Sequence, residues 1–261
     1  MIMQTIHLYD LLEIQKIREP EIQIVSNLSF LPVNENNLVY KAARLLQEEF
    51  ALTDGISVKL TKRIPVAAGM AGGSTDAAAM LYAMNQLYDL GLSRRELMKR
   101  GVQIGADVPY CLMRGTALAE GIGEKLTQLP PMIKCPVLIA KPSISVSTKF
   151  VYQNLKLDEQ TNHPDIDALM KDIREKDFDG VCAHMGNVLE SVTIPNYPVI
   201  AEIKQQMMRS GAKASMMSGS GPTVFGLFED GETAKRALRE MKRSGLAKQV
   251  YLTTIYNNRR K

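Results

Sequence analysis

Apolar and polar residues alternate over several short stretches, and this two-residue period is typical of a half-buried β-strand. The alternation is strict at 56–60 and is also present at 3–8 and 22–25, so residues 1–25 are predicted to be rich in β-structure. Other short runs with strand-like composition predict further strands at 110–113, 116–120, 137–140, 213–217, 222–228 and 249–255.

A period of three to four residues predicts helices between these strands. An Asn-Asn pair can cap a helix that ends near residue 50. Apolar positions on one helical face mark a second helix at 77–88, and a Ser-x-x-Glu capping box begins a third at 93–105. Further helices are predicted at about 148–154, 165–176, 180–191, 197–210 and 232–244.

These elements mix helices and strands without a regular βα alternation, which favours the α+β class. A chain of 261 residues is long enough for one large domain or for two smaller ones. The pattern is interrupted at Pro130-Pro131. We therefore predict two domains, at 1–134 and 135–261.

Composition and charge narrow the function classes. The chain has 45% hydrophobic and 23% charged residues, with no apolar run of about 18 residues and no signal-peptide pattern at its start. Its 32 Lys and Arg residues exceed its 28 Asp and Glu residues by only four, and they are spread along the chain. We expect a cytoplasmic protein that binds neither a membrane nor nucleic acid.

Cysteine and histidine usage gives no sign of a metal centre built from these residues. The three cysteines, Cys111, Cys135 and Cys182, are far apart and lie among apolar neighbours, so we expect buried reduced thiols. The three histidines form no recognisable ligand or triad pattern.

The candidate chemistry begins at a glycine-rich segment that follows the strand at 56–60. The segment contains Pro65, Val66, Ala67, Ala68, Gly69, Met70, Ala71, Gly72, Gly73, Ser74, Thr75 and Asp76. A strand, a glycine-rich turn and a helix with Ser, Thr or Asp at its start make a phosphate site, because backbone N–H groups at a helix N-terminus have no internal partners. Oxygen atoms of Ser74, Thr75 or Asp76 can help to hold Mg²⁺.

This segment differs from the two commonest phosphate loops. It has neither the Gly-Lys-Ser/Thr ending of a Walker A loop nor the G-x-G-x-x-G fingerprint. A flexible strand-to-helix turn is therefore the alternative interpretation. A second glycine-rich segment at 215–225, which joins two predicted strands, favours a binding role, although a tight hairpin turn is its own alternative.

Four motifs together resemble the superfamily of galactokinase, homoserine kinase, mevalonate kinase and phosphomevalonate kinase. They are Pro65-Val-Ala-Ala-Gly-Met-Ala-Gly-Gly-Ser-Thr-Asp76, Gly105-Ala-Asp-Val-Pro109, Ala119-Glu-Gly-Ile-Gly-Glu124 and Ser218-Gly-Ser-Gly-Pro-Thr-Val-Phe225. The similarity is greatest to the branch that phosphorylates a cytidine diphosphate-linked methylerythritol in the non-mevalonate pathway of isoprenoid biosynthesis. It extends over essentially the whole chain.

The resemblance implies a kinase with two domains. For the whole protein we expect a monomer or a homodimer. The first domain would contain a left-handed βαβ crossover, and the second would be ferredoxin-like. ATP and the substrate alcohol would meet in the cleft between the domains. ATP would bind at Pro65 to Thr75 with Mg²⁺, and Asp107 would accept the substrate proton or orient the hydroxyl. Gly219, Ser220 and Gly221 would lie beside the substrate, and Tyr152 would stack on its cytosine.

Two of these roles have structural alternatives. Asp107 precedes Val108-Pro109 and can also be a helix cap or a turn residue. Tyr152 can simply pack on one face of an amphipathic helix. Glu96 lies where some superfamily members keep a metal-binding Glu, but its capping-box position explains it better.

The sequence departs from the superfamily pattern at its start. The resemblance implies an earlier strand that carries a Lys and an Asn, followed by an Asp-Gly-Tyr-His turn, and Met1 comes after both. A start codon placed too late is the favoured explanation, and a truncated or impaired chain is the alternative. One functional alternative is another small-molecule alcohol kinase of the same superfamily. The other, which follows from the absent Lys, is an inactive nucleotide-binding remnant.

Overall fold

The structure, a computed structural model, describes residues 1–157 and 163–258. The chain divides into two compact units. Unit 1 comprises Met1, Leu8–Val66 and Ala71–Gln128, and unit 2 comprises Ile2–His7, Ala67–Met70 and Leu129–Lys261. The domain boundary predicted at 134/135 stays a prediction.

Unit 1 contains a three-stranded sheet in the order β2 (Leu11–Ile17), β4 (Gly55–Thr61), β3 (Ile22–Ser26). β2 is antiparallel to β4, and β3 is parallel to it. Helix α1 (Leu38–Glu49) connects β3 with β4, so the three elements form a parallel βαβ unit. The hand of this crossover stays a prediction.

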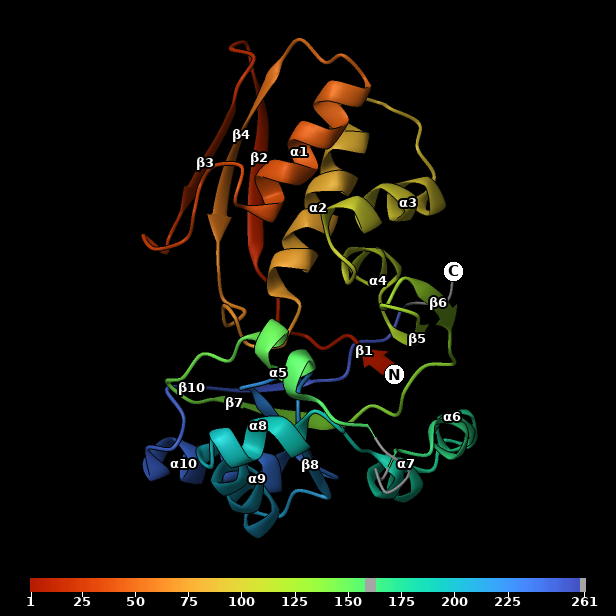
Figure 1. Ribbon diagram of the computed structural model, residues 1–261, viewed down its shortest axis with the longest axis vertical. Helices are drawn as coiled ribbons and strands as arrows, with labels where there is room; N and C mark the ends of the chain where they lie inside the picture. The colour runs from red at the N-terminus through yellow and green to blue at the C-terminus, as the bar shows by residue number, and fades with distance from the viewer. Residues whose placement is uncertain (158–162, 259–261) are drawn as a thin grey trace. The chain divides into compact units, whose positions relative to one another are not determined.

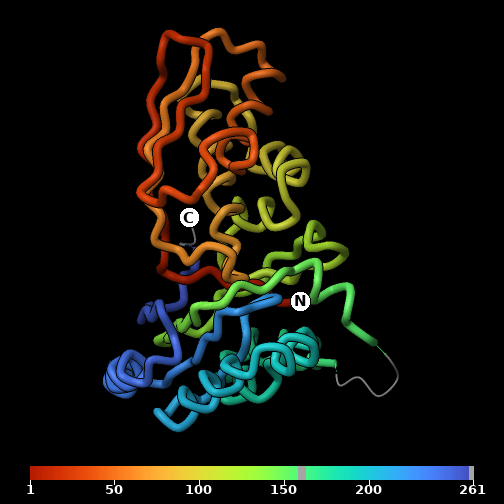
Figure 2. The backbone as a smooth tube through the Cα atoms, turned by 60° about the vertical axis from the view of Figure 1, so that its left-hand side comes forward, coloured from red at the N-terminus to blue at the C-terminus, as the bar shows by residue number. Residues whose placement is uncertain are grey.

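Helices cover one face of this sheet. Figure 1 shows α1 and α2 (Gly72–Leu87) against it, and Figure 2 shows the same layers from another side. Alternation in β4 places Val58 and Leu60 in the core, both at most 1% exposed. The predicted Asn cap of α1 is confirmed, because the Asn37 side chain accepts a hydrogen bond of 2.9 Å from the N–H of Val39.

The remainder of unit 1 is formed by α3 (Arg94–Ile104), α4 (Val108–Met113), β5 (Thr116–Glu120) and β6 (Lys125–Gln128). The capping box at the start of α3 is confirmed. The strand predicted at 110–113 was wrong, because these residues belong to helix α4. A short apolar run cannot be assigned by periodicity alone, and a proline in the first turn favours a helix.

Unit 2 is built on an antiparallel sheet in the order β10 (Gln249–Thr254), β7 (Pro136–Lys141), β9 (Val224–Leu227), β8 (Ala214–Met217). Helices lie between β7 and β8 in the chain, and again between β9 and β10. This is the βαββαβ connection with strand order 4-1-3-2. The predicted ferredoxin-like arrangement is therefore confirmed, as is the α+β class.

Helices α9 (Val199–Arg209) and α10 (Gly231–Ser244) pack on this sheet (Figure 1). Their apolar faces join the strands in one core, in which Leu138, Ile203 and Phe228 are fully buried. The other helices of unit 2 are α5 (Thr148–Asn154), α6 (Ile166–Glu175), α7 (Phe178–His184) and α8 (Glu190–Asn196), while β1 (Ile2–Gln4) is its first strand.

The helix predicted at 180–191 was wrong in part. The chain leaves helical geometry after His184 and enters it again at Glu190. Asn187 lies in this interruption, and its side chain bonds to backbone groups of another segment instead of continuing a helical surface. Among the described residues, no helix has the length and apolar composition needed to cross a membrane.

Candidate active site

The glycine-rich segment leads directly into α2, but the helix begins earlier than expected. Its first residue is Gly72, and its N-cap is Ala71, which has a left-handed backbone (φ 50°) and no side-chain capping bond. Ser74, Thr75 and Asp76 therefore lie inside the first two turns and do not cap the helix. The first N–H groups of α2 have no side-chain cap, and such groups bind anions.

The three predicted metal ligands have different surroundings. Thr75 Oγ1 donates a 2.9 Å hydrogen bond to the carbonyl oxygen of Ala71 and lies 3.4 Å from Cys111 Sγ. Asp76 is buried and accepts a 2.6 Å hydrogen bond from Lys62 Nζ. Ser74 is half-buried, and no described residue forms a hydrogen bond with its hydroxyl. The contacts therefore favour Ser74 as the hydroxyl that can reach a metal ion.

Sequence reasoning missed the ion cluster beneath this helix. The ammonium of Lys62 lies between the carboxylates of Asp10 and Asp76, and all three side chains are at most 4% exposed. Asp10 also accepts a 2.8 Å hydrogen bond from the N–H of Ile64. No sequence pattern links Asp10 with Lys62, because the two residues lie 52 positions apart.

Burial gives the cluster an unusual protonation state. It raises the pKa of Asp76 to about 7, because the ionised carboxyl is removed from water; Lys62 opposes this rise, and Asp10 adds to it. The second oxygen of Asp76, Oδ1, is buried and has no hydrogen-bond partner among the described residues. One ammonium thus faces two carboxyl groups, one of which holds a proton over part of the neutral pH range.

Asp107 lies at the first position before α4 with φ −85° and ψ −12°, but its side chain makes no capping bond. Burial raises the pKa of its carboxyl above the ordinary value of 3.8. No hydrogen bond or ion pair joins this carboxylate to any described residue. The geometry therefore gives no support to the alternative role of Asp107 as a helix cap.

Two neighbouring segments of unit 1 place Asp107 beside the glycine-rich segment. A Cβ atom built on Gly105 would lie 3.9 Å from Ser74 Oγ, and Cys111 of α4 contacts Thr75 of α2. A Cβ atom built on Gly123, in the turn between β5 and β6, would lie 3.9 Å from Asp107 Oδ1. The carboxylate thus lies beside that turn, and the residues on either side of it, Gly105 and Cys111, approach the first turns of α2.

The two glycine-rich segments contact each other within unit 2. The contacting residues are 149 positions apart in the sequence. The hydroxyl of Ser218 donates a 2.8 Å hydrogen bond to the carbonyl oxygen of Gly69. Gly69 has φ 68°, and a Cβ atom there would come within 2.2 Å of the Ser218 carbonyl oxygen. Only glycine fits this position.

The second segment is also the turn that joins β8 to β9, so the hairpin interpretation is correct. Within this turn the N–H of Gly221 donates a hydrogen bond of 2.9 Å to the carbonyl oxygen of Ser218. The hydroxyl of Ser220 lies 2.9 Å from that of Thr148, at the start of α5. Tyr152 follows one turn later in α5 and is 55% exposed, so it is not a core residue.

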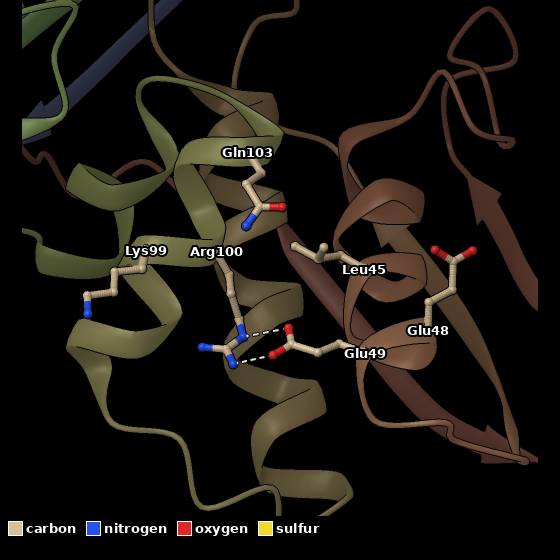
Figure 3. Close-up of a pocket in the computed structure, with 6 residues that line it drawn as sticks. All are labelled: Leu45, Glu48, Glu49, Lys99, Arg100 and Gln103. Carbon is tan, nitrogen blue, oxygen red and sulfur yellow. Dashed lines mark hydrogen bonds and ion pairs between the residues drawn. The ribbon is translucent and has the colours of Figure 1, made fainter.

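A hollow between α1 and α3 does not belong to this site. It is lined by Leu45, Glu48, Glu49, Lys99, Arg100 and Gln103. Figure 3 shows Arg100 and Glu49 pointing toward each other across the hollow, where Arg100 Nε donates a 2.8 Å hydrogen bond to Glu49. Its central charges are paired with each other, and none of the predicted site residues lines it.

Comparison with known proteins identifies the family of this chain. The family described as "GHMP kinases N terminal domain" matches residues 37–115, and "GHMP kinases C terminal" matches residues 169–247. The chain therefore belongs to the GHMP kinase family and is an ATP-dependent phosphotransferase.

Its relatives within the family carry a more specific name. The chain is 57% identical, over 98% of its length and 89% of the relative, to 4-diphosphocytidyl-2-C-methyl-D-erythritol kinase of Lachnospira eligens. It is 54% identical to the protein of the same name from Lachnoclostridium phytofermentans, over 99% and 89% of the two chains. A solved structure of 4-(cytidine 5'-diphospho)-2C-methyl-D-erythritol kinase matches with a TM-score of 0.84 at 28% identity, over 98% and 90%.

Proposed function

We propose that this chain transfers the γ-phosphoryl group of ATP to the 2-hydroxyl of 4-diphosphocytidyl-2-C-methyl-D-erythritol. The observation that carries the proposal is the Asp107 carboxylate, which has no partner among the described residues and belongs to the segment that approaches the uncapped start of α2 at Gly105. The names of relatives up to 57% identical over nearly the whole chain support this substrate. The product belongs to non-mevalonate isoprenoid precursor biosynthesis.

The glycine-rich segment at 65–75 is proposed to bind the triphosphate. Its first-turn N–H groups in α2 carry partial positive charge and need no rearrangement to accept phosphate oxygens. Ser74 is proposed to help hold a divalent cation, which would neutralise charge on the β- and γ-phosphates. Thr75 and Asp76 are less suited to that role, because each already has a partner.

Asp107 is proposed to orient the acceptor hydroxyl and to take its proton. The hydroxyl oxygen forms a bond to the γ-phosphorus while the bond from that phosphorus to the β–γ bridging oxygen breaks, and ADP leaves with the electron pair. Burial raises the pKa of Asp107, which makes it a stronger base than an exposed aspartate.

The acceptor's nucleotide portion is proposed to bind to unit 2. Gly219, Ser220 and Gly221 can approach phosphate oxygens closely, and Tyr152 offers an exposed ring that can stack on cytosine. Ser220 and Tyr152 are linked locally through Thr148, which bonds to Ser220 and begins the helix that carries Tyr152.

A panel of acceptor alcohols tests the substrate. The chain is incubated with ATP, Mg²⁺ and either the cytidine diphosphate-linked alcohol, homoserine or mevalonate, and ADP and phosphorylated product are measured together. We expect stoichiometric product from the cytidine diphosphate-linked alcohol alone. Phosphorylation of homoserine or mevalonate instead, or ATP binding without turnover of any alcohol, would overturn the proposal.

A further inference from the structure

The segment between α7 and α8 makes an unusual set of contacts with the second glycine-rich turn. The side-chain amide of Asn187 donates two hydrogen bonds, to the carbonyl oxygens of Met217 (2.9 Å) and Gly219 (2.8 Å). Its Oδ1 accepts a 3.0 Å hydrogen bond from the N–H of Leu189, which fixes the orientation of the amide group. All three bonds lie within unit 2.

Glu190 completes the attachment at the neighbouring backbone group. Its carboxylate accepts a 2.8 Å hydrogen bond from the N–H of Met217 and is paired with Lys204 on its other oxygen. Met217 ends β8, which is an edge strand of the sheet. Asn187 and Glu190 therefore take both backbone polar groups of Met217 on an edge where no further strand pairs with them among the described residues.

Four successive carbonyl oxygens of this segment, from Met217 to Ser220, accept hydrogen bonds. Those of Met217 and Gly219 accept from Asn187, that of Ser218 accepts from the N–H of Gly221, and that of Ser220 accepts from Thr193 Oγ1 at 3.4 Å. The amide N–H groups of Gly219 and Ser220 have no acceptor among the described residues. Consecutive free amides with a left-handed glycine (Gly219, φ 57°) make a concavity that suits an anion.

We propose that Asn187 is a positioning residue, which holds the carbonyl groups of Met217 and Gly219 so that the amides of Gly219 and Ser220 remain available to phosphate oxygens. Those oxygens belong either to ATP or to the diphosphate of the acceptor. This rests on the proposed function, which assigns the turn to a phosphate-bearing ligand. The three hydrogen bonds of the Asn187 side chain all join it to backbone groups of described residues.

Asn187→Asp tests the proposal with almost no change in side-chain volume. It keeps the acceptor for Leu189 but replaces the two donors by an oxygen that faces two carbonyl oxygens. We expect the KM for ATP or for the acceptor to rise about tenfold or more, as for lost hydrogen bonds to a charged ligand, with a smaller change in kcat. Measuring the two KM values separately identifies the source of the phosphate.

Asn196→Asp is the matched control, because Asn196 donates a single bond of 2.8 Å to the carbonyl oxygen of Val192 within α8. A second readout is pH: protonation of the carboxyl introduced by Asn187→Asp restores one donor, so its KM defect should narrow as pH falls. Unchanged KM values, or equal effects of the two substitutions, would overturn the proposal. If Asn187→Asp does not fold, Asn187→Ser, which keeps one donor, takes its place.

A binding measurement separates this proposal from the proposed function. In ¹⁵N-glycine-labelled protein, the Gly219 amide resonance should shift when ADP or CDP is added, and Asn187→Asp should abolish the shift. This outcome does not require turnover of any alcohol. If the Gly219 resonance of the wild-type chain does not shift with either nucleotide, the role proposed for the turn is contradicted, even if the kinase reaction is observed.

Discussion

Asp76 and Asp107 are both carboxyl groups whose pKa is raised by burial, but they have different partners. Asp76 is bonded to Lys62, whereas no described residue bonds to the carboxylate of Asp107. A buried carboxyl that is paired stabilises local structure, and one that is unpaired in a site is available for chemistry. Asp76 therefore anchors α2 through Lys62, whereas Asp107 is the proposed base.

The first prediction concerns the pKa of Asp107. Its carboxyl should titrate above the ordinary value of 3.8, because burial disfavours the ionised form. Titration of ¹³C-carboxyl-labelled aspartates by NMR measures this, with Asp107→Asn to assign the resonance. A measured pKa of Asp107 at or below 3.8 would show that the side chain is well solvated, and this would contradict the structure.

A second prediction concerns Asp76 and stability. With a folded pKa of about 7, above its unfolded value of 3.8, Asp76 binds a proton in the folded state over a range where the unfolded chain has lost it. Its contribution is therefore fully present below about pH 4 and is lost as pH rises through 7. Asp76→Asn cannot ionise and lacks this dependence.

The measurement is the free energy of unfolding in urea of wild type and Asp76→Asn. Relative to the wild type, the variant should gain roughly 1.4 kcal/mol for each pH unit between about pH 4 and pH 7. Asp54→Asn, at an exposed carboxyl, serves as the control. A difference between Asp76→Asn and wild type that stays constant with pH would contradict the protonation state described for the cluster.

The roles of residues within a contiguous motif could be predicted from the sequence, but the roles of residues outside such motifs could not. Gly69 and Asp107 belong to patterns in which neighbouring residue types are informative. Lys62 and Asn187 look like ordinary surface residues, because their partners, Asp10 and Gly219, are distant in sequence. Their roles follow only from tertiary contacts.

At the scale of elements, short segments were the least predictable. The helix at 108–113 lies in a short apolar run that periodicity alone cannot assign, and in the interruption between α7 and α8 the Asn187 side chain bonds to a distant segment. Longer elements with a capping signal, such as α1 and α3, were predicted correctly because the cap and the apolar face agree. Strand β2 lies within the β-rich region expected at 1–25, but no alternation marked it separately.

A third prediction concerns the first glycine-rich segment as an element. Gly69→Ala should weaken ATP binding at least about tenfold, because the new Cβ would meet the Ser218 carbonyl oxygen at 2.2 Å and left-handed geometry disfavours alanine. Calorimetric titration with ATP measures the affinity. Gly231→Ala, at the start of α10 with nothing within 4 Å of a new Cβ, should leave it unchanged. Equal affinities for all three proteins would contradict the close approach of the two segments.

At the scale of the whole molecule, mixed helices and strands were sufficient to predict the α+β class. The strand order of unit 2 could not be derived from periodicity, since alternation shows that a strand exists but not which strand it pairs with. The ferredoxin-like arrangement was implied only by the resemblance of motifs, and the order β10-β7-β9-β8 confirms it.

If Asp107 activates the acceptor while the glycine-rich segment holds ATP, loss of the Asp107 carboxylate should slow turnover and leave ATP binding intact. Steady-state turnover of ATP and the cytidine diphosphate-linked alcohol is measured for the 261-residue chain and for Asp107→Asn, together with ATP affinity. We predict that kcat falls by roughly 100-fold or more while the ATP affinity stays within about threefold. Turnover that survives Asp107→Asn at the wild-type rate would contradict this role of Asp107.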